Sequence, residues 1–166
     1  MTLANQYAIA VRHQRSTRID SDLSETFFPG LVYHGTAQTA LDTLIRQYSQ
    51  SGQSAHTLTG PYGSGKSTIA LLLSGLLSFD IKIRDAADNV INSDSKALIE
   101  KSLQIKNGWL QIRSVGGVNT PIETFWSATL SALKEHPNTR KLFNKYSSYI
   151  PRNESELITT WETLFV

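Results

Sequence analysis

The chain contains no cysteine, which excludes disulfide bonds and thiolate metal sites. It also lacks an apolar run long enough to cross a bilayer, because its longest such run, residues 69–77, is interrupted by Ser74 and Gly75. Charged residues make up only 18% of the 166 residues, and lysines and arginines form no strong cluster. We therefore expect one folded domain with no membrane segment. The N-terminus has no apolar signal-peptide core, so a cytoplasmic location is predicted.

One complete motif is present, G-x-x-x-x-G-K-S, which is the P-loop pattern for phosphate binding. Glycines let backbone N–H groups approach phosphate oxygens, and the helix that follows points its positive dipole end at the same anion. Lysine at this position reaches the β- and γ-phosphates, and the serine hydroxyl ligates Mg²⁺. We predict ATP and Mg²⁺ as cofactors, Lys66 as the catalytic residue and Ser67 as the metal ligand. The predicted cofactor-binding residues are Gly60, Pro61, Tyr62, Gly63, Ser64, Gly65, Lys66, Ser67 and Thr68.

The elements around this motif alternate between strand and helix patterns. Residues 55–59 and 109–115 are predicted strands, and residues 39–50, 66–78 and 121–135 are predicted helices. Gly52 is expected at the C-cap of the first of these helices, and Thr120 with Glu123 is expected to cap the last. The order strand, loop, helix predicts an α/β P-loop three-layer sandwich with a largely parallel sheet, incomplete in this chain.

The remaining residues give weaker patterns. Residues 79–83 are predicted to be a short strand or a continuation of the preceding helix, and residues 84–107 a surface insertion with one helix at 95–103. Helical pieces are expected at 138–148 and 153–165. Residues 1–31 are interpreted as an N-terminal arm or edge element, and residues 32–166 as the nucleotide-binding domain. The three tryptophans are expected in the core, and His56 is expected to be a packing residue.

Hydrolysis of ATP requires an acidic residue that this chain does not show. In P-loop ATPases a second apolar strand ends in an acid that holds the Mg²⁺ shell, but the strand at 109–115 ends Arg113-Ser114-Val115. Either the chain binds a nucleotide without hydrolysing it, or the acid lies beyond Val166 in a longer protein. The apolar ending of residues 161–166 favours the second explanation.

The order of elements over residues 32–135 resembles that of AAA+ ATPases and the related STAND-type signalling ATPases. The resemblance implies that Val32, Tyr33 and His34 lie near the adenine ring. It also implies an ATPase module from the N-terminal part of a larger protein that couples Mg·ATP binding and hydrolysis to a conformational change. A bacterial defence system is one expected setting for such a protein. An arginine finger from a neighbouring subunit would complete such a site. Self-association or other subunits are therefore the expected partners, and DNA binding stays open.

Three other classes of P-loop protein were weighed. A Ras-like GTPase is excluded because the motifs D-x-x-G and N-K-x-D are both missing. A small-molecule kinase stays open, with Arg140 and Arg152 as the late arginines that could cover a transferred phosphoryl group. A non-hydrolysing regulatory module that binds ATP also stays open.

Overall fold

The computed structural model describes residues 16–165, and within that range the chain is all-helical, with no β-strand. It forms seven α-helices there, together with the short 3₁₀ helices η3 (Glu25–Phe27) and η4 (Pro137–Thr139). The α-helices are α1 (Gly35–Ser51), α2 (Lys66–Leu76), α3 (Ile81–Asp88), α4 (Ser93–Ser102), α5 (Pro121–Glu135), α6 (Arg140–Tyr146) and α7 (Glu154–Phe165). The predicted α/β sandwich is therefore wrong. The interpretation of this chain as a P-loop ATPase module depended on that fold and is wrong as well.

The two predicted strands, residues 55–59 and 109–115, are irregular segments. Between residues 16 and 165 no ladder of backbone hydrogen bonds joins them to each other or to another segment. A strand needs such a neighbour, because its N–H and C=O groups are otherwise left to water. Leu58 is 36% exposed, so the first segment also lacks a well-buried face. The second segment is attached to a helix instead, since the Trp109 N–H donates to the Leu77 carbonyl at 2.8 Å.

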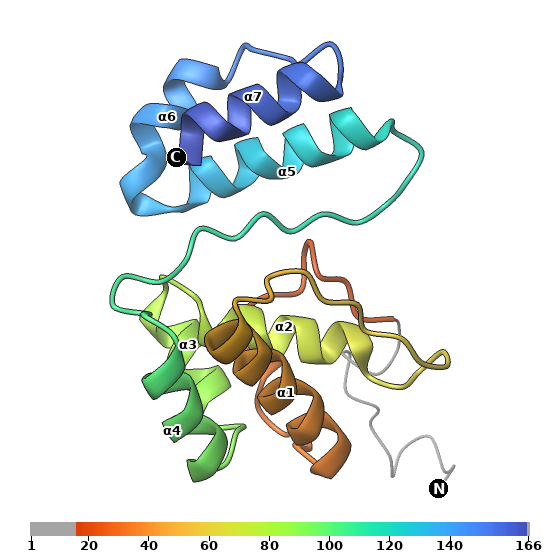
Figure 1. The fold of residues 1–166 in the computed structure, drawn as a ribbon, viewed down its shortest axis with the longest axis vertical. Coiled ribbons are helices and arrows are strands. Elements are labelled where there is room, and N and C mark those ends of the chain that lie inside the picture. Colours follow the sequence, from red (N-terminus) through yellow and green to blue (C-terminus); the bar gives the residue numbers. More distant parts are fainter. Residues whose placement is uncertain (1–15, 166) are drawn as a thin grey trace, which may run out of the picture.

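The first helical group comprises η3 and α1–α4, which lie together in the lower half of Figure 1. Within it α2 packs on α3, and α1 packs on both α4 and α2. The buried side chains are aliphatic and aromatic: Phe27, Phe28, Leu41, Ile45, Leu71, Leu72, Leu76, Leu77, Ala87, Ile99 and Leu103. Gly75 on α2 permits a close approach of side chains in this core, because a Cβ there would lie 2.4 Å from Cζ of Phe28 and 2.7 Å from Cβ of Ala87. Glycine is therefore required at this point of the core.

Local capping determines where the helices of the first group begin and end. The Asp80 carboxylate accepts the Lys82 N–H at 2.9 Å, and the Asn92 amide oxygen accepts the Ser95 N–H at 2.9 Å. These caps start α3 and α4. Residues 79–83 are therefore neither a strand nor a continuation of α2. Gly52 ends α1 in the left-handed conformation, with φ of 68°, which confirms the predicted C-cap.

The predicted surface insertion at residues 84–107 is also wrong. Helix α4 lies against α1, and its Ser95 and Ile99 are buried. Ala87 on α3 and Leu103 after α4 belong to the same core. Residues 84–107 are therefore part of the first helical group and not an insertion on its surface.

The predicted arm of residues 1–31 lies only partly within the described residues. Residues 1–15, with Arg12 and Arg15, are outside them, as is Val166. Arg18 pairs with Asp20 at 2.7 Å, and Phe28 is fully buried in the first helical group. None of the helices between residues 16 and 165 is both long and apolar enough to cross a membrane.

The second helical group comprises α5, η4, α6 and α7, in the upper half of Figure 1. Helix α5 begins with the predicted capping box, in which Thr120 Oγ1 accepts the Glu123 N–H and the Glu123 carboxylate accepts the Thr120 N–H. Trp126 is buried in this group, as predicted, and its indole N–H donates to the Tyr149 carbonyl at 2.6 Å. Trp161 is partly buried, and its indole N–H donates to Thr129 Oγ1 at 3.0 Å.

The segment of residues 104–119 passes between the two helical groups (Figure 1). Its Gln111 amide donates to the Ser74 carbonyl on α2 at 2.8 Å, and its Arg113 pairs with Glu135 on α5 at 3.3 Å. The rings of Phe79 and His136 meet edge to face, with centroids 5.1 Å apart. These contacts form a junction between the groups.

Candidate functional site

The loop that carries the G-x-x-x-x-G-K-S motif joins the irregular segment 53–59 to the N-terminus of α2. Its Gly63 and Gly65 have φ values of 79° and 82°, in the left-handed region that side-chain-bearing residues rarely adopt. Gly65 is also the N-cap of α2. The motif's glycines therefore shape the backbone locally, although no sheet supports the loop among residues 16–165.

Lys66 folds back over this loop. Its Nζ donates to the carbonyl oxygens of Gly60 at 2.9 Å and Pro61 at 2.8 Å, and to Ser64 Oγ at 3.3 Å. The loop itself is closed by a turn in which the Ser64 N–H reaches the Pro61 carbonyl at 3.3 Å. An ammonium group has three donors, so all three are directed at the loop. The structure therefore brings three of the predicted site residues, Gly60, Pro61 and Ser64, around the ammonium group of a fourth, Lys66.

The first turn of α2 adds further hydrogen-bond donors. The first helical hydrogen bond runs from the Ile69 N–H to the Gly65 carbonyl at 2.9 Å. The N–H groups of Lys66, Ser67 and Thr68 precede this bond and have no acceptor within the helix. No acidic side chain lies in this first turn. The electrostatic character of the site is therefore cationic, from the helix dipole and the Lys66 ammonium together.

Two other predicted site residues lie at the surface of the loop. The Tyr62 side chain is 92% exposed, and its hydroxyl makes a hydrogen bond with Ser16 Oγ. Ser67 is exposed at the start of α2, where its hydroxyl can be reached from solvent. No group of three or more metal-ligating side chains occurs between residues 16 and 165. Mg²⁺ ligation by Ser67 stays a prediction.

Val32, Tyr33 and His34, the residues that the resemblance placed near an adenine ring, lie at the start of α1 and beside α4. Val32 is 80% exposed, and His34 is the N-cap residue of α1. The Tyr33 hydroxyl is 3.0 Å from Ser95 Oγ on α4, and burial raises the pKa of Tyr33 although the Ser95 hydrogen bond opposes the shift. Tyr33 thus serves the packing of the first helical group.

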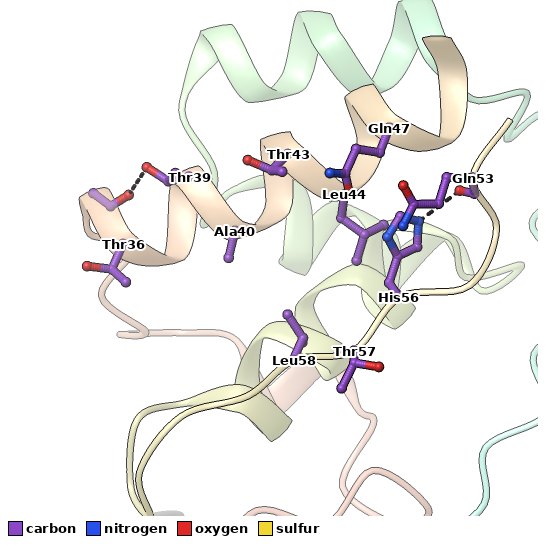
Figure 2. Close-up of a pocket in the computed structure, with 11 residues that line it drawn as sticks. Thr36, Thr39, Ala40, Thr43, Leu44, Gln47, Gln53, His56, Thr57 and Leu58 are labelled. Carbon is purple, nitrogen blue, oxygen red and sulfur yellow. Dashed lines mark hydrogen bonds between the residues drawn. The ribbon is translucent and has the colours of Figure 1, made fainter. Parts of the chain in front are cut away.

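A separate groove lies between α1 and the segment 53–58 (Figure 2). Its volume is about 760 Å³, and its lining includes Thr36, Thr39 and Thr43 on α1 and His56 on the segment. The His56 ring nitrogen Nε2 is 2.9 Å from the Gln53 carbonyl oxygen, so the ring is held against its own segment. None of the described residues that line the groove is a lysine or an arginine. Phosphate recognition is therefore favoured at the loop and not in the groove.

Nothing in the sequence predicted this groove or the pair of polar side chains at the junction, Gln111 and His136. A threonine stripe along a helix is common on solvated faces, and His136 next to Pro137 indicated only the end of a helix. Both features depend on which segments meet in space. No local signal could have identified them.

Comparison with protein-family models, with curated proteins and with solved structures gave no match to this chain. The resemblance to AAA+ and STAND-type ATPases is wrong, because the described residues lack the sheet on which those ATPases are built.

Proposed function

We propose that the loop of residues 60–67 and the first turn of α2 bind the phosphate groups of a nucleotide, with ATP and Mg²⁺ as the pair that the motif predicts. The observation that carries the proposal is the convergence of Lys66 Nζ on the Gly60 and Pro61 carbonyls beside a helix N-terminus. A cation and unpaired backbone N–H groups at one place are the donor set that phosphate oxygens require.

Phosphate binding would replace the hydrogen-bond acceptors of the Lys66 ammonium group. Carbonyl oxygens carry only partial charge, whereas phosphate oxygens carry formal charge and accept stronger hydrogen bonds. An arriving phosphate would therefore draw the Lys66 ammonium away from the Gly60 and Pro61 carbonyls. Ser67 would supply a hydroxyl oxygen for Mg²⁺ from the adjacent position. The proposal concerns binding alone and assigns no hydrolytic step to this chain.

The proposal is tested by titration calorimetry of the protein with ATP, with and without Mg²⁺, and with GTP and tripolyphosphate as alternative ligands. Lys66→Ala is expected to weaken ATP binding by about 10- to 100-fold, because charge-assisted hydrogen bonds contribute roughly 1.5–3 kcal/mol. Lys82→Ala is the matched control, since Lys82 is an exposed lysine on α3 outside the loop. Its affinity is expected to stay within about twofold of the unmodified protein.

A second variant addresses the metal. Ser67→Ala is expected to abolish the gain in affinity that Mg²⁺ provides and to leave the metal-free affinity unchanged. Far-ultraviolet circular dichroism of each variant verifies that α2 still forms. If folded protein fails to bind ATP at millimolar concentration, or if Lys66→Ala binds it as well as the unmodified chain does, the loop is a structural turn and the proposal is wrong.

A further inference from the structure

Two buried polar atoms at the junction of the helical groups have no hydrogen-bond partner among the described residues. They are Oε1 of Gln111 and Nε2 of His136. His136 is only 7% exposed, at the end of α5, and Gln111 lies on the segment that passes between the groups. An unpaired buried polar atom destabilises the fold, so two at one place require an explanation.

The two atoms have complementary hydrogen-bonding roles. The Gln111 side-chain nitrogen donates to the Ser74 carbonyl at 2.8 Å, which assigns Oε1 as the free acceptor. The His136 ring accepts the Asn138 N–H at Nδ1, at 3.3 Å. A neutral imidazole whose Nδ1 accepts a hydrogen bond carries its proton on Nε2. The pair therefore consists of one unused acceptor and one unused donor.

Both side chains line the same small cavity, which has a volume of about 20 Å³. A single water molecule needs roughly 10–15 Å³ on this scale, so one water fits there and a larger ligand does not. Ser78 lines the cavity as well, and its Oγ accepts the Asp80 N–H at 3.1 Å, so its own proton is available. The cavity thus offers a water molecule three polar groups, which is the usual number for buried water.

We propose that one buried water molecule occupies this cavity and joins the two helical groups. The water accepts the His136 Nε2 proton, donates one hydrogen to Gln111 Oε1 and makes its third hydrogen bond with the Ser78 hydroxyl. Gln111 is anchored to Ser74 on α2, and His136 ends α5, so the water connects these two helices. The ring of Phe79 packs against the His136 ring beside it.

Magnetic relaxation dispersion of water nuclei counts the long-lived internal waters of a protein in solution and tests this site. His136→Phe preserves an aromatic ring against Phe79 but removes the Nε2 donor, and Gln111→Met preserves the length of the side chain but removes the acceptor. Each variant is expected to lose one long-lived water. The double variant is expected to lose that same one water and no second.

His136→Gln is the matched rescue, because its amide can donate from a similar position, and it is expected to retain the water. This variant also keeps the test decisive if His136→Phe does not fold. Long-range ¹H–¹⁵N correlation spectra of the unmodified protein are expected to show His136 protonated at Nε2. An unchanged water count in all variants overturns the proposal. So does a proton on Nδ1, or a scalar coupling that reveals a direct bond between His136 and Gln111.

Discussion

The two helical groups are held together in different ways. The first group has a centre of leucine, isoleucine and phenylalanine side chains, and Ser95 is among its few buried polar residues. The Ser95 hydroxyl donates to Asp42 Oδ1 at 2.7 Å and lies 3.0 Å from the Tyr33 hydroxyl. The second group places hydrogen bonds inside its centre, from the indoles of Trp126 and Trp161 to Tyr149 and Thr129.

Among the described residues the second group has more edge-to-face ring contacts than the first, in which Phe27 and Phe28 meet edge to face at 5.3 Å. In the second group the ring of Trp126 meets Tyr149 edge to face at 5.6 Å, and the rings of Phe125 and Trp161 meet at 6.1 Å. Such contacts depend on orientation as well as on buried area. We therefore expect the first group to be most sensitive to lost volume and the second to be most sensitive to lost directional bonds.

Removal of the Phe28 ring gives the largest expected effect. Phe28→Ala empties a fully buried position against Gly75 and is expected to lower the free energy of unfolding by about 3–5 kcal/mol. Urea titration followed by circular dichroism measures the change. Phe165→Ala, at the exposed end of α7, is the matched control and is expected to cost less than about 1 kcal/mol.

The same experiment shows whether the groups unfold together. In a Trp109→Phe background the fluorescence comes from Trp126 and Trp161, which both belong to the second group. Coincident midpoints by fluorescence and by circular dichroism indicate one cooperative unit. A fluorescence midpoint that does not move in Phe28→Ala would show that the second group is stable without the first.

Loss of a single directional bond in the second group should have a smaller effect. Trp161→Phe keeps a ring against Phe125 but removes the indole donor to Thr129 Oγ1, which is expected to cost about 0.5–1.5 kcal/mol. A double-mutant cycle with Thr129→Val isolates this bond from the change in ring size. If the cycle gives no coupling energy, packing alone stabilises the second group, and its contrast with the first disappears.

Trp109→Phe is the comparison for Trp161→Phe, because it removes the same kind of indole donor at another site. The Trp109 indole donates to the Gln104 carbonyl at 3.1 Å at a partly exposed site of the junction. Water can replace this partner, so the same chemical change is expected to cost less there than at Trp161.

The helices could be predicted from the sequence because their signals are local. The expected helices at 39–50, 66–78 and 121–135 correspond to α1, α2 and α5. Gly52, Thr120 and Glu123 mark ends that the structure confirms. A cap requires only a few neighbouring residues, so the physics that determines it is fully contained in a short stretch of sequence.

The sequence could not show that the predicted sheet does not form between residues 16 and 165, because strand pairing depends on distant residues. Residues 55–59 and 109–115 have strand-like composition, but composition does not provide a partner strand. The P-loop motif then favoured a sheet that the described residues lack. The loop retains the local geometry of its glycines and of Lys66, which needs no sheet, and whether it binds phosphate stays a prediction.

The smallest expected effect concerns pH at the start of the second group. The Glu123 carboxylate accepts the N–H of Thr120 and its hydroxyl, both at 2.9 Å, and these hydrogen bonds lower the pKa of Glu123 below its ordinary value of 4.5. Because the folded pKa is the lower one, the capping box contributes its stability above the unfolded pKa. That contribution is lost as the pH falls from about 4.5 through the folded pKa.

An NMR titration of the Glu123 carboxyl measures this shift directly. The pKa is expected to lie below 4.5 in the unmodified protein and to return toward it in Thr120→Ala, which removes the hydroxyl donor. Glu123→Gln cannot ionise and is expected to remove this part of the acid dependence of stability. Because Glu123 is exposed, solvent screens its interactions and the effect is small. If the pKa of Glu123 is the same with and without the Thr120 hydroxyl, the backbone N–H alone accounts for the shift, and the hydrogen bond from the Thr120 hydroxyl to the Glu123 carboxylate contributes nothing to it.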